Sequence, residues 1–256
     1  MTTELLHGCD VSKYQSVGLV TWKTLDFGIA RATYGKWADP SAPAHLAAMR
    51  EGGAKPGLYG FFRADQDVAE QVATFWQVSQ LAHLAEGELI PWVDVEDFPG
   101  HVISSADMAS LDQFVEDLDK LFCCPVGIYI TQRDWHRLGK PAWILERPLW
   151  VAHYPRAGAT LPLAKAATPN GVPWRMWQWL VGPLGQMLQA PQHKRAVDQD
   201  VAVSPLPLIP AIDARSAPFE ASPSIPWLGL QDDDWREMVA ARDHTIAEQD
   251  EDLVMT

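Results

Sequence analysis

Short apolar runs recur along most of the chain, and in its first half they alternate with stretches of helical periodicity. Such runs are typical of buried strands, and we expect eight of them, at residues 6–11, 27–33, 57–62, 89–95, 126–130, 149–152, 175–179 and 196–201. Alternation of strands and helices indicates a parallel sheet with helices outside it, and eight strands are enough to close a barrel. The pattern therefore predicts an α/β fold, an irregular (β/α) TIM-like barrel.

Four helices are predicted between these strands from their start and stop signals. They cover residues 41–53, 67–87, 104–122 and 131–139. The second begins at Asp67, with Glu70 placed as in a capping box, and the fourth ends at Gly139. Beyond residue 155 the chain is rich in Pro, Gly and Gln and loses its helical periodicity, so we expect the later helices of the barrel to be short or missing.

The composition changes after residue 203, which we take as the end of the barrel. Residues 204–228 are rich in Pro and Ser and are typical of an extended linker. Residues 229–256 are acidic and predict one helix; from residue 231 onward nine Asp or Glu stand against two Arg, a net charge of −7. This tail is interpreted either as a contact for a protein partner or for self-association, or as a solvated end.

The overall charge and the termini narrow the functional classes. The 256 residues carry a net charge of −13, which makes nucleic acid an unsuitable partner. The three cysteines, Cys9, Cys123 and Cys124, do not suggest a disulfide framework. The start has no secretory signal, and no apolar run of about 18 residues occurs. We therefore expect a soluble protein made in the cytoplasm, with no membrane insertion.

Acidic residues occupy positions where a barrel places its chemistry. In the apolar stretch IPWVDVEDF, Asp94 and Glu96 are two residues apart, so an extended chain points both to one face. Asp10 follows the first strand and Asp198 lies in the last, and closure of a barrel makes these two strands neighbours. Four carboxylates would then surround the mouth at the C-terminal ends of the strands.

Two kinds of chemistry use such a cluster. A carboxyl group beside other carboxylates has a raised pKa, and a protonated acid beside an ionised one suits glycosidic cleavage. Hard oxygen ligands for Mg²⁺ or Ca²⁺ are the alternative, but no His or Cys spacing supports a metal, so we expect no metal or cofactor. Tryptophan decides in favour of sugar, because the chain has 12 Trp and Trp92, Trp150, Trp177 and Trp179 fall near the expected mouth. Some of these must also serve as core.

The motifs, taken in order, resemble the family 25 glycoside hydrolases, lysozymes that cleave N-acetylmuramic acid links in peptidoglycan. The resemblance spans residues 5–203. It rests on GCDVSKYQ at 8–15, DFGIARATYG at 26–35, PGLYGFF at 56–62, the D-x-E of VDVED, LWVAHY at 149–154, WQW at 177–179 and VDQD at 197–200. Each block is weak alone, but their order and spacing are specific together.

The resemblance implies roles for individual residues. Glu96 takes the position of the general acid and Asp94 that of its assistant at the developing positive charge, while Asp10 and Asp198 match the other acidic positions of the groove. The resemblance also places Tyr59 near the cleaved sugar. Together with the tryptophans of the expected mouth, the residues predicted to bind substrate are Tyr59, Trp150, His153, Tyr154, Trp177 and Trp179. His153 stands where the family often has Gln, and Asp200 stands where Asn is common. A covalent enzyme intermediate and assistance by the substrate's acetamido group both remain open.

The resemblance also implies bacterial peptidoglycan as the partner, and the lack of a secretory signal favours a phage endolysin released through a holin-type membrane hole, or a virion component. The alternative is a lysozyme-like module for wall binding or virion structure that has lost catalysis. The intact acidic set argues against that loss, because a binding module does not need carboxylates that repel one another.

Overall fold

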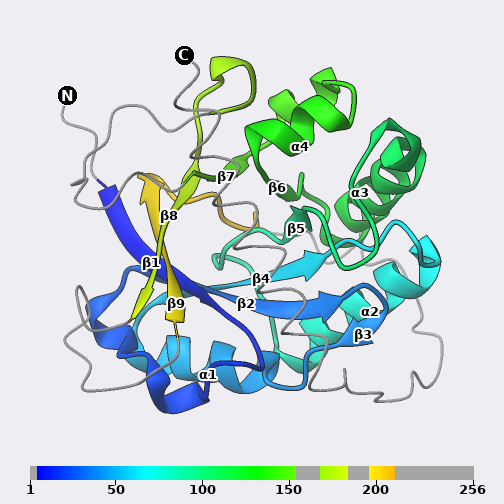
Figure 1. Ribbon diagram of the computed structural model, residues 1–256. Helices are drawn as coiled ribbons and strands as arrows, with labels where there is room; N and C mark the ends of the chain where they lie inside the picture. The colour runs from blue at the N-terminus through cyan, green and yellow to red at the C-terminus, as the bar shows by residue number, and fades with distance from the viewer. Residues whose placement is uncertain (1–4, 154–167, 184–195, 211–256) are drawn as a thin grey trace.

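The computed structural model describes residues 5–153, 168–183 and 196–210 (Figure 1). Its strands are β1 (Leu5–Val11), β2 (Phe27–Tyr34), β3 (Trp37–Ala38), β4 (Lys55–Phe61), β5 (Trp92–Val95), β6 (Gly127–Ile130), β7 (Leu149–Ala152), β8 (Met176–Pro183) and β9 (Ala196–Val203). Its α-helices are α1 (Ala42–Gly52), α2 (Val68–Leu81), α3 (Met108–Phe122) and α4 (Gln132–Arg137). All eight expected strands and all four expected helices are therefore present.

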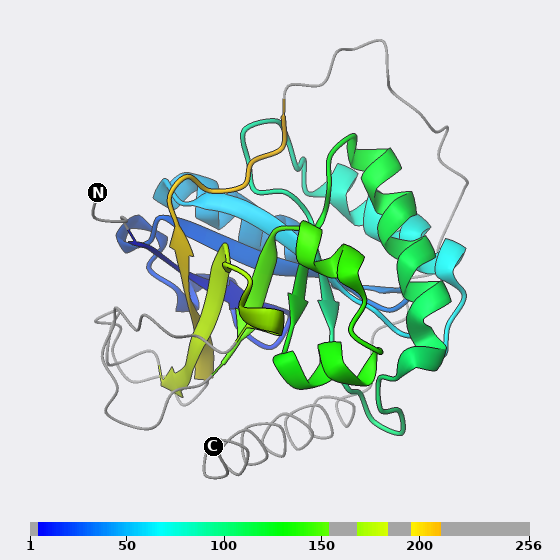
Figure 2. The same cartoon turned by 90° about the horizontal axis from the view of Figure 1, so that it is seen from above.

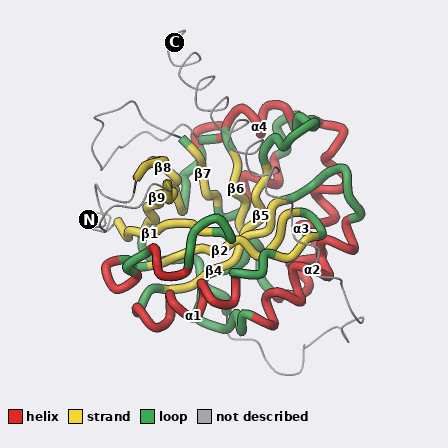
Figure 3. Tube along the Cα trace, turned by 60° about the horizontal axis from the view of Figure 1, so that its bottom comes forward, coloured by secondary structure: helices red, strands yellow, loops and turns green. Residues whose placement is uncertain are grey.

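The sheet closes into a barrel of eight strands. The order is β1-β9-β8-β7-β6-β5-β4-β2, and a further pairing of β1 with β2 completes the ring. The short β3 pairs with Thr33 and Tyr34 at the end of β2. The α-helices lie outside the strands, from α1 past α2 and α3 to α4 (Figures 2 and 3). On the side formed by β8, β9 and β1, the described residues contribute no α-helix (Figure 3). The irregular α/β barrel predicted from the sequence is confirmed.

The direction of the last strand differs from the expected parallel arrangement. β9 runs antiparallel to both of its neighbours, β1 and β8, whereas the other barrel pairings are parallel. Two antiparallel neighbours need no crossover helix, which agrees with the absence of helical periodicity between β8 and β9 in the sequence. The reversal brings the start of β9 to the C-terminal end of β1, where Asp198 pairs with Asp10.

The helix ends follow local chemistry. The Asp67 carboxylate accepts a hydrogen bond from the backbone N–H of Glu70 at 2.9 Å, so the predicted cap of α2 is present. At the start of the third predicted helix, Ser104 and Asp107 form a complete capping box. α2 ends at Leu81 rather than near Gly87, because the chain turns at His83, whose φ is +54°. The fourth helix is six residues long, Gln132–Arg137, and lies within the short range 131–139 predicted for it. Within the described ranges, no helix combines the length and apolar character needed to cross a bilayer.

Residues 204–210 do not leave the barrel as the linker boundary at residue 204 predicted. The backbone of Pro207 and Ile209 makes three hydrogen bonds of 2.8–3.0 Å with Gly87, Glu88 and Ile90. Ile209 is 4% exposed and belongs to the main hydrophobic core. The folded unit therefore extends to residue 209 at least, because an isoleucine in this segment completes the core beneath the start of β5. The rest of the proposed linker and the acidic helix lie outside the described residues.

We predict that a chain ending after Pro210 keeps the melting temperature of the full chain. A chain ending after Val203 should lose about 3–5 kcal/mol, since it gives up the burial of Ile209 and three backbone hydrogen bonds. Chemical denaturation of the two shortened chains beside the full chain measures this difference. Equal stability of both shortened chains would restore the boundary at residue 204.

The barrel interior also depends on a close approach between β5 and β6. A Cβ placed on Gly127 would lie 2.2 Å from the ring of Trp92, which is fully buried. We predict that Gly127→Ala costs about 1–3 kcal/mol of unfolding free energy, because an overpacked core must shift rings or backbone. Gly18→Ala is the matched control, since nothing lies within 4 Å of its added Cβ. Urea denaturation should separate the two variants, and similar values for both would contradict the packing argument.

Candidate active site

Four aspartates gather at one end of the barrel, where β1 and β5 finish and β9 starts. Asp10 and Asp94 are 8% and 7% exposed, and both act electrostatically on Tyr59. Asp198 pairs with Asp10 across β1 and β9, and Asp200 lies two residues further along β9 at 1% exposure. Three of the four predicted acidic residues are thus brought together, with Asp200 as an additional member of the cluster.

Neutral side chains from β6, β7 and β8 hold this cluster. The Tyr129 hydroxyl donates to Gln178 Oε1 at 2.8 Å, and Gln178 Nε2 donates in turn to Asp10 Oδ2 at 2.7 Å. The indole N–H of Trp150 donates to Asp200 Oδ1 at 2.9 Å. Gln178 and Asp200 are also cross-strand partners, so adjacent strands hold the two buried carboxyl groups through uncharged donors.

Tyr59 lies between the acidic cluster and a buried cation. Burial raises the pKa of Tyr59 well above its usual value; Arg31 opposes this shift, and Asp10, Asp94 and Asp39 add to it. The phenol therefore keeps its proton at neutral pH. Burial alone would lower the pKa of Arg31, but Tyr59, Asp39 and Tyr14 raise it overall, so the guanidinium stays charged. Its Nε donates to Asp39 at 3.1 Å, in a pair that is almost completely buried.

Glu96 lies nearer to solvent than Asp94. It follows the last residue of β5 and is partly exposed. It acts on Tyr34, whose pKa is raised to about 12 by burial, against the opposing influence of Arg63 and Arg31. The Arg63 guanidinium lies 4.0 Å from the ring centroid of Phe98 and 5.0 Å from that of Tyr34. A rim of aromatic rings and one arginine therefore borders Glu96.

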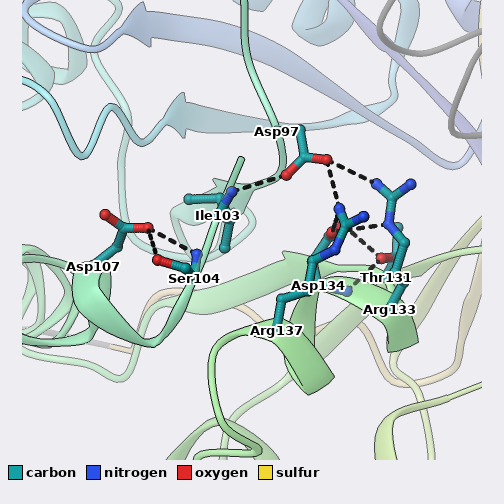
Figure 4. Close-up of polar contacts among 8 residues, drawn as sticks. All are labelled: Asp97, Ile103, Ser104, Asp107, Thr131, Arg133, Asp134 and Arg137. Carbon is teal, nitrogen blue, oxygen red and sulfur yellow. Dashed lines mark hydrogen bonds and ion pairs between the residues drawn. The ribbon is translucent and has the colours of Figure 1, made fainter. Parts of the chain in front are cut away.

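The loop after Glu96 is anchored to α4 by an ionic network (Figure 4). Asp97 Oδ2 accepts from Arg137 at 2.7 Å and from Arg133 at 3.3 Å, and Asp97 Oδ1 accepts from the backbone N–H of Ile103 at 2.9 Å. Asp134, fully buried, accepts from Arg133 and from the Thr131 hydroxyl. These contacts fix the backbone immediately after Glu96, so Asp97 is a positioning residue for it.

The tryptophans need a correction. Trp150 and Trp177 are 2% and 1% exposed, which leaves no ring face for a sugar. Trp150 packs edge-to-face on Trp92, Tyr59 and Tyr129 instead. Trp179 is 8% exposed and lies at an irregularity between Gln178 and Leu180 that breaks the strand alternation. Gln178, between Trp177 and Trp179, is the residue that reaches the carboxylates.

Of the two remaining predicted contacts, the structure describes His153, which directly follows β7. His153 is partly exposed, stacks on Trp177 at 6.1 Å between centroids, and accepts the Trp177 indole N–H at its carbonyl at 2.6 Å. Burial lowers the pKa of His153, so its ring is neutral at pH 7. Tyr154 lies outside the described residues. Among the described residues, no group of three or more His, Cys, Asp or Glu side chains is arranged to hold a metal ion.

Four residues of this region were not predicted: Gln178, Tyr129, Arg31 and Asp97. Gln178 and Arg31 carry a usable signal, since each is a polar residue inside an apolar strand, as Asp94 is. Tyr129 and Asp97 carry none, because a tyrosine in a strand and an acid in a loop are common.

Comparisons with known proteins agree with this geometry. A family model described as glycosyl hydrolases family 25 matches residues 9–181, a range that includes Asp10, Asp94 and Glu96 but ends before β9. A bacterial lysozyme from Streptomyces coelicolor is 22% identical, over 76% of this chain and 90% of its own, with a TM-score of 0.61. A family 25 lysozyme from Aspergillus fumigatus is 20% identical (79% and 95% covered, TM-score 0.61).

A third solved structure is the catalytic domain of an endolysin from bacteriophage P40 of Listeria monocytogenes. It is 20% identical and covers 78% of this chain and 94% of its own, with a TM-score of 0.55. No curated protein matches the chain. At sequence identities of 20–22%, the similarity to solved structures supports the fold alone. The assignment to a family rests on the match to the family model.

Proposed function

The chain belongs to family 25 of the glycosyl hydrolases, and we propose that it is a lysozyme that hydrolyses the β-1,4 bond between N-acetylmuramic acid and N-acetylglucosamine in bacterial peptidoglycan. The observation that carries this proposal is the placement of Asp94, buried at the end of β5 beside Tyr59, with Glu96 two residues further on at the open rim. A buried acidic group behind a partly exposed one supplies both charge stabilisation and a transferable proton.

In the proposed reaction Glu96 donates its proton to the glycosidic oxygen as the bond from that oxygen to the sugar C1 breaks. The leaving sugar departs as an alcohol, and positive charge develops on the ring that remains. Asp94 stabilises that charge, directly or by orienting the acetamido group of the substrate. Water then adds to C1, and its proton returns to Glu96, which regenerates the acid.

The surroundings of the two residues support these roles. Asp94 is held in a strand whose neighbours, Trp92 and Val93, are fully buried, so its position is rigid. Glu96 is followed by Asp97, which the arginines of α4 hold in place. A site that must keep a carboxyl group within a few tenths of an ångström of its productive position benefits from such support.

Product analysis tests the proposal. Purified peptidoglycan is digested, reduced with borohydride and analysed by mass spectrometry. New reducing ends on N-acetylmuramic acid support a lysozyme, whereas ends on N-acetylglucosamine or free peptides would identify another bond and overturn the assignment. Digestion should be unchanged in EDTA, because the proposed steps use side chains and water alone.

The second candidate function is a wall-binding or virion module without catalysis. Zymography together with a sedimentation assay for wall binding separates the two: binding without clearing supports the module, and clearing supports the enzyme. The place of action, lysis after holin-type release or within a virion, remains a prediction. It is tested by looking for the protein in purified virions and in the lysate.

We predict that Glu96→Gln lowers wall clearing by about 10²–10⁴-fold with an unchanged melting temperature, because glutamine keeps the shape and removes the transferable proton. The matched control is Glu86→Gln, an exposed glutamate, which should clear the wall like the unmodified chain. Turbidity assays on purified wall measure both. A folded Glu96→Gln protein with more than about a tenth of the original rate would refute Glu96 as the acid.

Asp94→Asn is expected to reduce turnover strongly while wall binding changes little. The reason is that Asp94 acts on charge that develops only in the transition state. Turnover is measured by release of soluble fragments, and binding by sedimentation of the Glu96→Gln protein with and without the second substitution. An equal loss in both assays would make Asp94 a ground-state contact instead.

A further inference from the structure

Asp200 is the most deeply buried acidic group of the cluster and has no role in the steps above. Its side chain is 1% exposed. One carboxyl oxygen, Oδ1, accepts the indole N–H of Trp150 at 2.9 Å. The other, Oδ2, is buried and receives no N–H or O–H hydrogen bond from a protein donor. Asp10, itself a carboxyl group, is close enough to act on the pKa of Asp200 both as a charge and as a side-chain hydrogen-bond partner.

The charged residues of the described part of the chain that act on Asp200 are two aspartates. Asp10 comes from β1 and Asp198 from β9, and both act on Asp200 as negative charges. Cys9, also on β1, is a neutral thiol, because burial together with these aspartates raises its pKa. The elements β7 and β8 contribute Trp150 and Gln178, which are uncharged. The buried arginine of the site, Arg31, instead pairs with Asp39 and acts on Tyr59.

Two ionised carboxylates cannot share a hydrogen bond, because each offers only acceptors. A hydrogen bond between Asp10 and Asp200 therefore requires one proton between them. Asp10 Oδ2 already accepts Gln178 Nε2 at 2.7 Å and lies nearer to solvent, which favours its charged form. Asp200 is buried, and burial raises its pKa well above the usual value, with Asp10 and Asp198 adding to the shift.

We propose that Asp200 is a positioning residue that stays protonated at neutral pH and donates a hydrogen bond to Asp10, holding that carboxylate in the site. Together with Gln178, it gives Asp10 two donors, both neutral. The role of Asp10 in the reaction rests on the proposed lysozyme function, whereas the shared proton does not.

The proton on Asp200 makes the free energy of unfolding depend on pH. In the unfolded chain Asp200 loses its proton near pH 3.8, its ordinary value, while the folded chain retains it. Between that pH and the raised folded pKa the native state binds more protons than the unfolded state, so stability falls as the pH rises. Asp200→Asn removes this slope, because asparagine does not titrate, and its amide can donate to Asp10 while its oxygen accepts from Trp150.

Infrared difference spectroscopy tests the protonation state directly. The spectrum of the unmodified protein minus that of Asp200→Asn at neutral pH should contain the C=O stretch of a protonated carboxylic acid. A carboxylate band in its place would overturn the proposal.

Thermal melts are the second test. The melting temperature of Asp200→Asn relative to the unmodified chain should increase from about pH 4 to about pH 8. A constant difference would contradict a raised pKa. Asp117→Asn, on the surface of α3, is the matched control in both measurements and should show neither effect.

Kinetics then test the positioning role. Asp200→Ala should reduce kcat for wall cleavage at least tenfold with little change in KM, and Asp200→Asn should restore most of that loss. If Asp200→Ala and Asp200→Asn lower kcat by the same factor, the hydrogen bond donated by residue 200 is not what holds Asp10. If the unmodified chain cleaves no wall at all, the lysozyme proposal fails, yet the infrared and melting data still decide whether Asp200 carries the proton.

Discussion

Burial of like charges at one end of a closed apolar barrel is the constraint on which the rest of this structure depends. Each buried carboxylate loses its hydration, and neighbouring carboxylates repel one another. The chain tolerates this because the barrel supplies specific donors: Gln178 for Asp10 and Trp150 for Asp200. Those donors come from strands β7 and β8, so the acidic cluster is complete only when the barrel has closed. The site therefore depends on the complete barrel and not on any one strand.

The reversed last strand makes that arrangement possible. In an all-parallel barrel, residues near the start of a strand lie at the end opposite the active site. Because β9 runs antiparallel, Asp198, near its start, lies beside Asp10, near the end of β1. The same strand carries Asp200 two positions later, so alternation gives both residues the same face. One change of direction thus brings two aspartates of the last strand to the same site as Asp10 of the first strand.

Much of the fold could be predicted from the sequence, since periodicity and capping report local structure. The eight strands, the cap at Asp67 and the short fourth helix all depend on residues close in the chain. What periodicity does not report is which distant residues meet. Gln178 and Asp10 are 168 positions apart, and Tyr129 and Gln178 are 49 apart. The direction of β9, the packing of Ile209 and the burial of Trp150 and Trp177 depend on such long-range contacts, and there the sequence predictions needed correction.

The buried carboxyl groups of Asp10 and Asp200 and the partly exposed carboxylate of Asp97 are held by different kinds of contact, because they lie at different depths below the surface. In the interior, a cation beside Asp10 or Asp200 would favour full ionisation and remove any proton the pair shares. Neutral donors from Gln178 and Trp150 fix position without forcing charge. Near the surface, Asp97 is held by the guanidinium groups of Arg133 and Arg137. Water partly screens these charges, so their electrostatic effect on neighbouring carboxyl groups is weaker than it would be in the interior. Glu96, which precedes Asp97, is thereby fixed through its backbone. A general acid must be in a defined position when the substrate takes its proton, and a rigid backbone supplies that position.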